Sequence, residues 1–409
     1  MTHLRDVNVN FKDAMYLDSF NRLKVAQPTA GFDAYFPNGD NYAMYSSITA
    51  NGGTVTYLPS EGGFNLAVTT SAGSRALRET SRYFLNTPGR SHVAVVGGLL
   101  SQPKAGLVSR MGYYDDEDGV FIELNTSGVC IVKRSSVTGS VVEERVYRNN
   151  WNFDKLDGLG PSGVNLDITK IQVFGFDLQW AGSGRIRIAA LIDGNIYKMH
   201  EFTHINVIST PAFKTTILPM RYELLNESNT SSASTMKQYG SSIMSEGLVN
   251  VNPHVYSSDS SLVSTTISST AWTPLVSFRI GGMKMGHKFR GYVEIVDFSF
   301  FFIGNNPSII YRAVANATLS GPTNWAYANP ASAIQIDTGA TSMTGGLSKV
   351  TGYAGAGGTK SAGSSGSVSD DFILYSKPNG VNDIITICAR STSGGASGFA
   401  CGTWAEIGG

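Results

Sequence analysis

The feature that most constrains the fold is a series of three segments in which residue types alternate, the last two of them joined by a two-residue turn. The large apolar residues of segment 171–180 recur at a period of two and therefore share one face of a strand: Phe174, Phe176, Leu178 and Trp180. Residues 185–193 alternate in the same way, and Asp193-Gly194 then leads into residues 195–202. Asp and Gly both tolerate positive φ, which a tight hairpin turn requires. The sequence therefore predicts an antiparallel β-hairpin.

Further strand patterns cover most of the chain. In its first half they lie at residues 92–100, 119–124, 129–134 and 218–225. In its second half they lie at residues 273–280, 289–302, 308–319, 370–375, 383–390 and 397–407. Strands that recur with turn residues every 8–12 positions are typical of sandwiches and jelly rolls. No apolar period of 3.6 residues is sustained for three turns, so we predict an all-β protein.

Length and local composition suggest the domain boundaries. The chain has 409 residues, and single domains usually hold about 100–200. We expect an irregular N-terminal arm at 1–60, a lectin-like jelly-roll sandwich at 61–250 and a second β-sandwich at 251–409. The polar segment 226–242 is interpreted as a loop or linker, and the Gly/Ser-rich segment 345–369 as an exposed flexible loop.

Charge and cysteine content exclude several classes of protein. The 31 Lys and Arg residues balance 31 Asp and Glu residues, whereas a nucleic-acid-binding protein needs a basic surplus. No segment is long and apolar enough for a membrane span, and no signal peptide precedes the first strands. Cys130, Cys388 and Cys401 show no metal-binding spacing. They fit buried small residues in a cytosol-made protein, and a Cys388–Cys401 bridge stays open. We expect no cofactor.

One short motif suggests a metalloprotease. His200-Glu-Phe-Thr-His204 matches H-E-x-x-H, which binds zinc when a helix brings both imidazoles to one face. Here the segment continues the hairpin that follows Asp193-Gly194. Positions i and i+4 of a strand lie roughly 13 Å apart, too far for two ligands of one ion. We therefore interpret the segment as a strand with surface or interface histidines.

Other chemistry-bearing patterns are weak. The acidic run Asp115-Asp-Glu-Asp118 could hold Ca²⁺ but lacks EF-hand spacing, and we favour a charged hairpin turn. No nucleophile elbow occurs, so we expect no catalytic residue and no metal ligand. Carboxylate pairs for glycoside hydrolysis stay open, because such residues can be far apart in sequence.

Several long segments resemble a widespread, largely uncharacterised family of bacteriophage virion structural proteins. They lie at residues 18–28 (DSFNRLKVAQP), 81–89 (SRYFLNTPG), 112–119 (GYYDDEDG), 151–163 (WNFDKLDGLGPSG), 200–204 (HEFTH), 383–390 (DIITICAR) and 404–407 (WAEI). The resemblance covers most of the chain. It implies a component of the virion, made in the host cytoplasm. It carries no catalytic or binding residue over to this sequence, and it does not distinguish head from tail.

Three functions follow as hypotheses. The first is a non-enzymatic structural protein of the virion surface, decorating or fibre-like. The second is a receptor-binding adhesin of the tail, fibre or baseplate that recognises host surface glycans, for which the exposed loop at 150–170 offers Trp151, Phe153 and Lys155. The third is a glycan-cleaving enzyme. As partners we expect other virion proteins and sister subunits in a homo-oligomer, with a trimer as the specific expectation.

The N-terminal arm suggests an attachment segment. Its apolar residues fit no single strand, and the candidates for contact with the particle or a sister subunit are Phe11, Phe20, Arg22 and Leu23. Apolar area is worth about 25 cal/mol per Å² when buried, so these side chains need a partner surface. The alternative is that the arm folds back on its own first sandwich.

Overall fold

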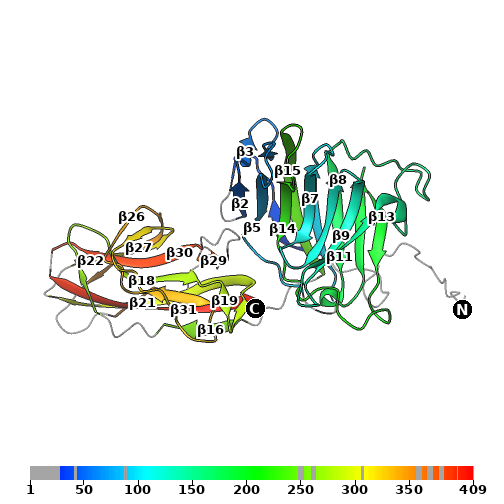
Figure 1. Ribbon diagram of the computed structural model, residues 1–409. Helices are drawn as coiled ribbons and strands as arrows, with labels where there is room; N and C mark the ends of the chain where they lie inside the picture. The colour runs from blue at the N-terminus through cyan, green and yellow to red at the C-terminus, as the bar shows by residue number, and fades with distance from the viewer. Residues whose placement is uncertain are drawn as a thin grey trace, which may run out of the picture. The chain divides into compact units, whose positions relative to one another are not determined.

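The computed structural model of the protein describes residues 28–40, 44–86, 88, 90–246, 253–258, 264–304, 308–355, 362–365, 372–376, 382–393 and 395–408. Within these residues the chain is all-β, as predicted, and short 3-10 turns are the only helical elements. The chain forms two compact units, one up to residue 249 without Ser81–Tyr83 and one from residue 250 with Ser81–Tyr83. We describe each unit by itself (Figure 1). No described helix has the length and apolar character needed to cross a membrane.

The first unit is a sandwich of two antiparallel sheets. One sheet has the order β13-β12-β11-β6-β15-β4-β3, and β1 also pairs with β15. Its strands are β1 (Pro28–Ala34), β3 (Thr54–Leu58), β4 (Gly63–Val68), β6 (His92–Leu99), β11 (Gln172–Leu178), β12 (Ile186–Ile192), β13 (Asn195–Phe202) and β15 (Ser234–Glu246). The other sheet has the order β10-β9-β8-β7-β14-β5-β2. Its strands are β2 (Tyr45–Ala50), β5 (Arg75–Thr80), β7 (Leu107–Tyr114), β8 (Gly119–Asn125), β9 (Gly128–Ser135), β10 (Val142–Tyr147) and β14 (Met220–Asn226).

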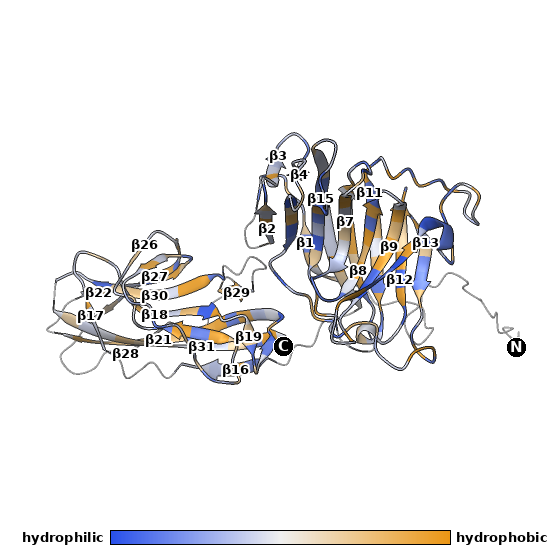
Figure 2. Cartoon of the chain, in the orientation of Figure 1, coloured by the Kyte–Doolittle hydropathy of each residue, from blue (hydrophilic) through white to orange (hydrophobic). Residues whose placement is uncertain are grey.

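The period-two pattern explains the core of this unit. Phe174, Phe176 and Leu178 lie on the inner face of β11 and are fully buried, as the alternation predicts. Residues from the facing sheet, such as Ile122 and Ile131, pack in the same core. Figure 2 shows the hydrophobic residues gathered along these strands. Trp180 departs from the prediction, because a 3-10 turn (η3, Trp180–Gly182) ends the alternation and leaves the ring 38% exposed.

The predicted turns are where the sequence places them. Asp193 and Gly194 both adopt positive φ, 50° and 78°, and join β12 to β13. This is the conformation that a two-residue hairpin turn requires. The predicted hairpin at 119–134 is β8 paired with β9.

Two expectations about the first unit are wrong. Strands β1, β2 and β3 lie within 28–58 and pair with β15, β5 and β4, so this part of the expected arm belongs to the sandwich. The expected linker 226–242 contains most of β15, which pairs with β4 and β6. The linker prediction failed because β15 is rich in polar residues and buries few side chains besides Met236 and Ile243 in the core.

The second unit also contains two main sheets. One has the order β16-β31-β21-β28, with β17 paired to β31 and β29 to β21. Its strands are β16 (His254–Ser257), β17 (Thr265–Ile267), β21 (Gly291–Gly304), β28 (Ala362–Ser365), β29 (Ile373–Tyr375) and β31 (Ala396–Gly408). The other has the order β24-β25-β18-β30-β22-β27. Its strands are β18 (Thr273–Ile280), β22 (Ser308–Ala315), β24 (Ala326–Tyr327), β25 (Ile334–Asp337), β27 (Leu347–Gly355) and β30 (Ile384–Ser391). The two-stranded ladders are β19 (Met283–Lys284) with β20 (His287–Lys288) and β23 (Thr318–Ser320) with β26 (Ser342–Thr344).

A separate hydrophobic core fills this unit, with Trp404, Phe278 and Phe300 among its large side chains. The expected Gly/Ser loop at 345–369 is wrong in part, because it contains β27 and β28. Gly and Ser weaken a strand locally, but pairing along the whole of β22 holds β27 in register. The three cysteines are free, and Cys388 and Cys401 lie in different sheets.

Candidate functional site

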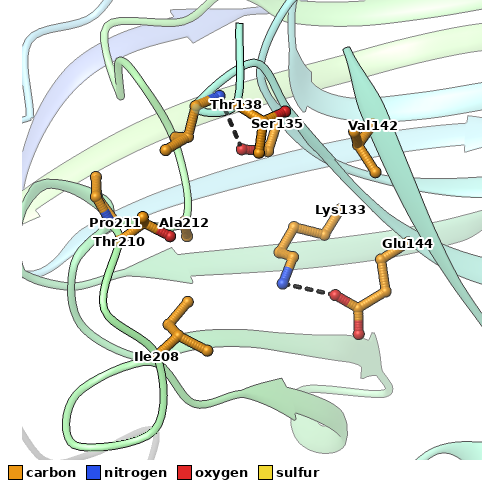
Figure 3. A pocket seen from close by; sticks show the side chains of 10 residues that line it. Lys133, Ser135, Thr138, Val142, Glu144, Ile208, Thr210, Pro211 and Ala212 are labelled. Atoms are coloured by element: carbon orange, nitrogen blue, oxygen red, sulfur yellow. Dashed lines mark hydrogen bonds and ion pairs between the residues drawn. The ribbon is translucent and has the colours of Figure 1, made fainter. Parts of the chain in front are cut away.

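The first unit has a pocket of about 200 Å³ at one edge of the sandwich. It lies between the β9–β10 hairpin and the segment that follows β13, and we call it the edge pocket (Figure 3). Its lining residues are Lys133, Ser135, Val137, Thr138, Val142, Glu144, Ile208, Thr210, Pro211 and Ala212. Both β10 and β13 are the last strands of their sheets, so the pocket opens where the two layers end.

Lys133 is the cationic group of the edge pocket. Strand alternation along β9 puts Lys133 on the same face as the core residues Val129 and Ile131, at the end where the core gives way to polar residues. Its ammonium lies 2.6 Å from a Glu144 carboxylate oxygen, and Figure 3 shows the two side chains pointing toward each other. The same ammonium lies 4.9 Å from the centre of the Phe202 ring. The pocket therefore combines an ion pair with apolar walls.

His204 touches this ion pair in a defined tautomer. Its Nδ1 lies 3.1 Å from the Gly184 carbonyl oxygen, which can only accept, so Nδ1 carries the proton. Nε2 is then free to accept from the Lys133 ammonium at 3.4 Å. Burial lowers the pKa of His204, which keeps the ring neutral at neutral pH.

His200 is also held by hydrogen bonding to the protein. Its Nδ1 accepts a hydrogen bond of 3.3 Å from the Asn152 backbone N–H. Burial lowers the pKa of His200 to about 4. Both histidines are buried, so the expectation of surface or interface histidines is wrong. They instead help to close the side of the sandwich.

The H-E-x-x-H segment begins in a strand, as its place in the predicted hairpin implied. His200 lies in β13, and His204 follows the end of that strand. Glu201 forms an ion pair with Lys198 at 2.5 Å. No group of three or more His, Cys, Asp or Glu residues within the described ranges could hold a metal ion. The geometry here serves packing and hydrogen bonding.

The predicted binding loop begins next to β13. Phe153 and Lys155 are exposed, and the Lys198 ammonium lies 3.3 Å from the centre of the Phe153 ring. Trp151 is only 4% exposed, so its assignment to an exposed loop is wrong. Its ring belongs to the core, and its Nε1 donates to the Val146 carbonyl at 3.1 Å. A large aromatic side chain at the start of a long loop serves here as an anchor.

The other sequence-predicted residues have simpler outcomes. Phe11, Phe20, Arg22 and Leu23 lie outside the described residues. The acidic run at 115–118 forms the turn between β7 and β8, as the favoured interpretation predicts. The Asp115 carboxylate accepts backbone N–H groups of Glu117 and Asp118, and the Asp118 carboxylate accepts those of Ser136 and Lys214. These carboxylates shape the turn.

Sequence reasoning missed a charged ladder on the outer face of the second sheet of this unit. We define it as Arg75, Glu79, Arg110, Asp116, Glu123, Arg134, Glu143, Arg145, Arg221, Glu223 and Glu227. Strand register brings residues far apart in sequence together, because Arg110 lies opposite both Glu123 and Glu223. The Arg110 Nε lies 2.8 Å from Glu123, and Arg145 Nε lies 3.0 Å from it. Charge at a period of two in β10 (Glu143 and Arg145) and β14 (Arg221 and Glu223) is the signal that could have revealed the ladder.

The electrostatics of the ladder keep two of its buried carboxylates, Glu123 and Glu223, ionised. Burial opposes the ionised form of Glu123, but hydrogen bonds and charge from Arg145 and Arg110 outweigh it and lower its pKa to about 2. The pKa of Glu223 is also lowered, because three arginines surround it. Each of the six carboxylates in the ladder pairs with at least one arginine. A glycosidase needs one carboxyl group that is protonated at working pH. Glu123 and Glu223 do not offer it, whereas burial raises the pKa of Glu79 to about 7 against its ion pair with Arg221.

Comparisons with known proteins found distant structural similarities. No family model matches the sequence, and no curated protein matches it. Among solved structures, the chain is similar to a β-glucanase of Bacillus licheniformis (15% identity, TM-score 0.35, 52% of this chain and 98% of that one). It is also similar to Crh5 transglycosylase (16% identity, TM-score 0.33, 55% and 89%) and to peanut lectin (11% identity, TM-score 0.30, 55% and 100%). Likenesses this weak carry no argument about the architecture or activity of this chain.

Proposed function

We propose that the protein is a non-enzymatic structural component of a bacteriophage virion, exposed on the particle surface as a decorating or fibre-like protein. The observation that carries this proposal is the charged ladder, whose carboxylates are committed to arginines. A sheet face built this way suits a rigid structural role, because ion pairs hold its buried carboxylates in place. The resemblance of residues 151–163 and 383–390 to virion proteins supports the location.

The test of this proposal is the position of the protein in intact particles. We expect antibodies against the purified chain to label assembled virions, and we expect peptides of the chain in mass spectra of purified particles. Its absence from purified particles, with its presence in the lysate of infected cells, would contradict the proposal. Head and tail fractions separated by density would then give its place on the virion.

A second candidate function is a receptor-binding adhesin of the tail, fibre or baseplate. The edge pocket favours it, because an ion pair with apolar walls suits a sugar ring with polar substituents. A glycan array tests it: selective binding to host surface glycans, reduced by Lys133→Gln, supports the adhesin. Incubation with host polysaccharide followed by reducing-end detection tests the third hypothesis, a glycan-cleaving enzyme.

We also propose a homo-oligomer, with a trimer as the specific expectation. Apolar residues around the edge pocket are exposed and would gain from burial against a sister subunit: Val141, Val142, Ile205, Val207 and Ile208. Light scattering on the purified chain at micromolar concentration checks this. A clean monomer mass would contradict it. We propose no nucleic-acid partner and no cofactor.

A further inference from the structure

The second unit carries arginines that, within the described residues, form no ion pair. They lie on the outer face of the sheet β24-β25-β18-β30-β22-β27. Strand register places Arg390, Ile310 and Tyr353 in one row across β30, β22 and β27. The neighbouring row contains Cys388 and Arg312. Because the buried residues of these strands alternate with them, Arg312, Arg390 and Tyr353 point away from the core.

A tryptophan joins the two arginines. The Arg312 guanidinium carbon lies 4.2 Å from the centre of the Trp272 ring, and that of Arg390 lies 5.3 Å from it. Trp272 is half-buried and packs against a small apolar cluster that contains Val314 and Cys388. The ring is therefore fixed in place, and it orients both guanidinium groups by cation–π contact.

A second pair of the same kind lies along the same sheet. The Arg279 guanidinium carbon lies 4.1 Å from the centre of the Trp325 ring, and Arg279 Nε donates to Gln335 at 2.9 Å. Trp272 and Arg279 are seven positions apart at the two ends of β18, which corresponds to roughly 20 Å at 3.3 Å per residue. We call Trp272, Arg279, Arg312, Trp325, Tyr353 and Arg390 the arginine–tryptophan surface.

The charges on this surface are not neutralised as they are in the ladder of the first unit. None of Arg279, Arg312 and Arg390 has an ion pair among the residues that the structure describes. Asp337 lies in the same sheet, but it is 1% exposed and accepts backbone N–H groups of Asn324 and Ala340. Tyr353 adds a ring that is 77% exposed. The surface therefore offers cations and aromatic rings together.

We infer that the arginine–tryptophan surface binds an acidic polysaccharide. Guanidinium groups held on aromatic rings form bidentate hydrogen bonds with carboxylates, and exposed rings stack on the apolar faces of sugars. Two pairs about 20 Å apart suit an extended chain of several sugar units. A neutral glycan would offer no carboxylate to pair with the positive charges of the three arginines. Duplex DNA carries one negative charge per about 1.7 Å, whereas the two arginine–tryptophan pairs lie about 20 Å apart, so a polyanion with sparser charge fits this surface better.

This inference rests on the second candidate function, for which it names a ligand class and a site in the second unit, separate from the edge pocket. It does not depend on where the protein lies in the virion. The experiment measures binding of the full chain to polygalacturonate by isothermal titration calorimetry. Dextran serves as the neutral comparison. We expect binding to polygalacturonate that weakens as salt rises, and at least tenfold weaker binding to dextran.

Variants locate the site. Arg312→Gln combined with Arg390→Gln should weaken binding to polygalacturonate about tenfold or more, and the double Lys variant should retain part of it because the charge remains. Arg185→Gln in the first unit removes the same charge elsewhere and should leave binding unchanged; circular dichroism checks that each variant is folded.

Unchanged binding by the double Gln variant, equal binding to dextran, or equally tight binding to single-stranded DNA would overturn the inference. Loss of polygalacturonate binding through Lys133→Gln alone would also overturn it, while leaving the adhesin proposal in place.

Discussion

Glu123 is 1% exposed although it points away from the apolar core of the first unit. Arginine explains this burial, because the methylene groups of Arg110 and Arg145 cover the face while their guanidinium groups bind the carboxylate. Tyr114, Phe121 and Cys130 form a small apolar cluster on the same face. At the scale of single residues, charged side chains on this face, such as Glu123, Arg110 and Glu223, are as buried as residues of the core.

Removal of one buried partner should therefore be costly. We expect Glu123→Gln to lower the free energy of unfolding by about 3 kcal/mol, because Arg110 and Arg145 lose a buried counterion. Glu227→Gln is the matched control, since Glu227 pairs with the same Arg110 but is 54% exposed at its side chain. That variant should cost about 0.5 kcal/mol. Urea unfolding followed by circular dichroism measures both, and equal losses would contradict the assignment of the energy to burial.

Buried histidines should make stability depend on pH. Burial lowers the pKa of His92 and of His200 to about 4, below the ordinary value of 6.5, so the unfolded chain takes up protons first on acidification. The contribution of these histidines to stability should thus be constant above about pH 6.5 and fall toward pH 4, by about 1.4 kcal/mol per pH unit for each histidine. Burial raises the pKa of Glu79 to about 7, which opposes this fall, so the difference between variants carries the test.

Urea midpoints measured between pH 7.5 and 5 test this window. His92→Gln removes one titrating group and should make the decline shallower. His254→Gln, at an exposed position of the second unit, should leave the slope of the first unit unchanged. An equal pH dependence in the parent chain and in His92→Gln would show that His92 is not buried as a neutral ring.

At the scale of elements, the loop after β10 shows how a long irregular segment can be held in one conformation. Asp154 is buried, and its carboxylate accepts the backbone N–H groups of Leu156 and Ser162, each at 2.8 Å. Gly160 passes so close to this carboxylate that a Cβ atom there would lie 2.1 Å from its oxygen. Leu156 and Leu166 enter the core on either side. The loop is thus built around one carboxylate.

We expect Asp154→Ala to release this loop. The loss of two hydrogen bonds to a charged group should cost about 2 kcal/mol. Chymotrypsin should then cut faster after Leu159, which is 92% exposed. Asp167→Ala, which removes an exposed carboxylate that accepts the Thr169 N–H, is the control and should leave the cleavage rate unchanged. Equal acceleration in both variants, measured by mass spectrometry of the fragments, would count against the role of Asp154.

The elements that could be predicted are those with strong local signals. Strand β13 and its turn at Asp193-Gly194 follow directly from alternation and turn chemistry. Strand β15 could not be predicted, because its stability comes from pairing with β6 and β4, which are far away in sequence. For the same reason the ionic partners of Glu123 and Lys133 could not be predicted from the sequence. Ionic partners across strands depend on register, which only the assembled sheet fixes.

At the scale of the whole molecule, the chain has two hydrophobic cores with no side chain in common. Phe174 and Phe176 lie in one core, and Phe278 and Trp404 lie in the other. Each core is closed by its own pair of sheets. A unit with its own core is expected to unfold cooperatively by itself.

We therefore expect two calorimetric transitions. Phe174→Ala should lower the midpoint of one transition and Phe278→Ala that of the other, because both rings are fully buried and each truncation costs about 3–5 kcal/mol. The pH dependence from His92 should move with the transition that Phe174→Ala affects, since both lie in the first unit. Differential scanning calorimetry of the three chains at pH 7 and pH 5.5 measures all of this. A single transition that both variants shift equally would mean that the two cores unfold as one, and the first unit could then not be tuned separately from the second.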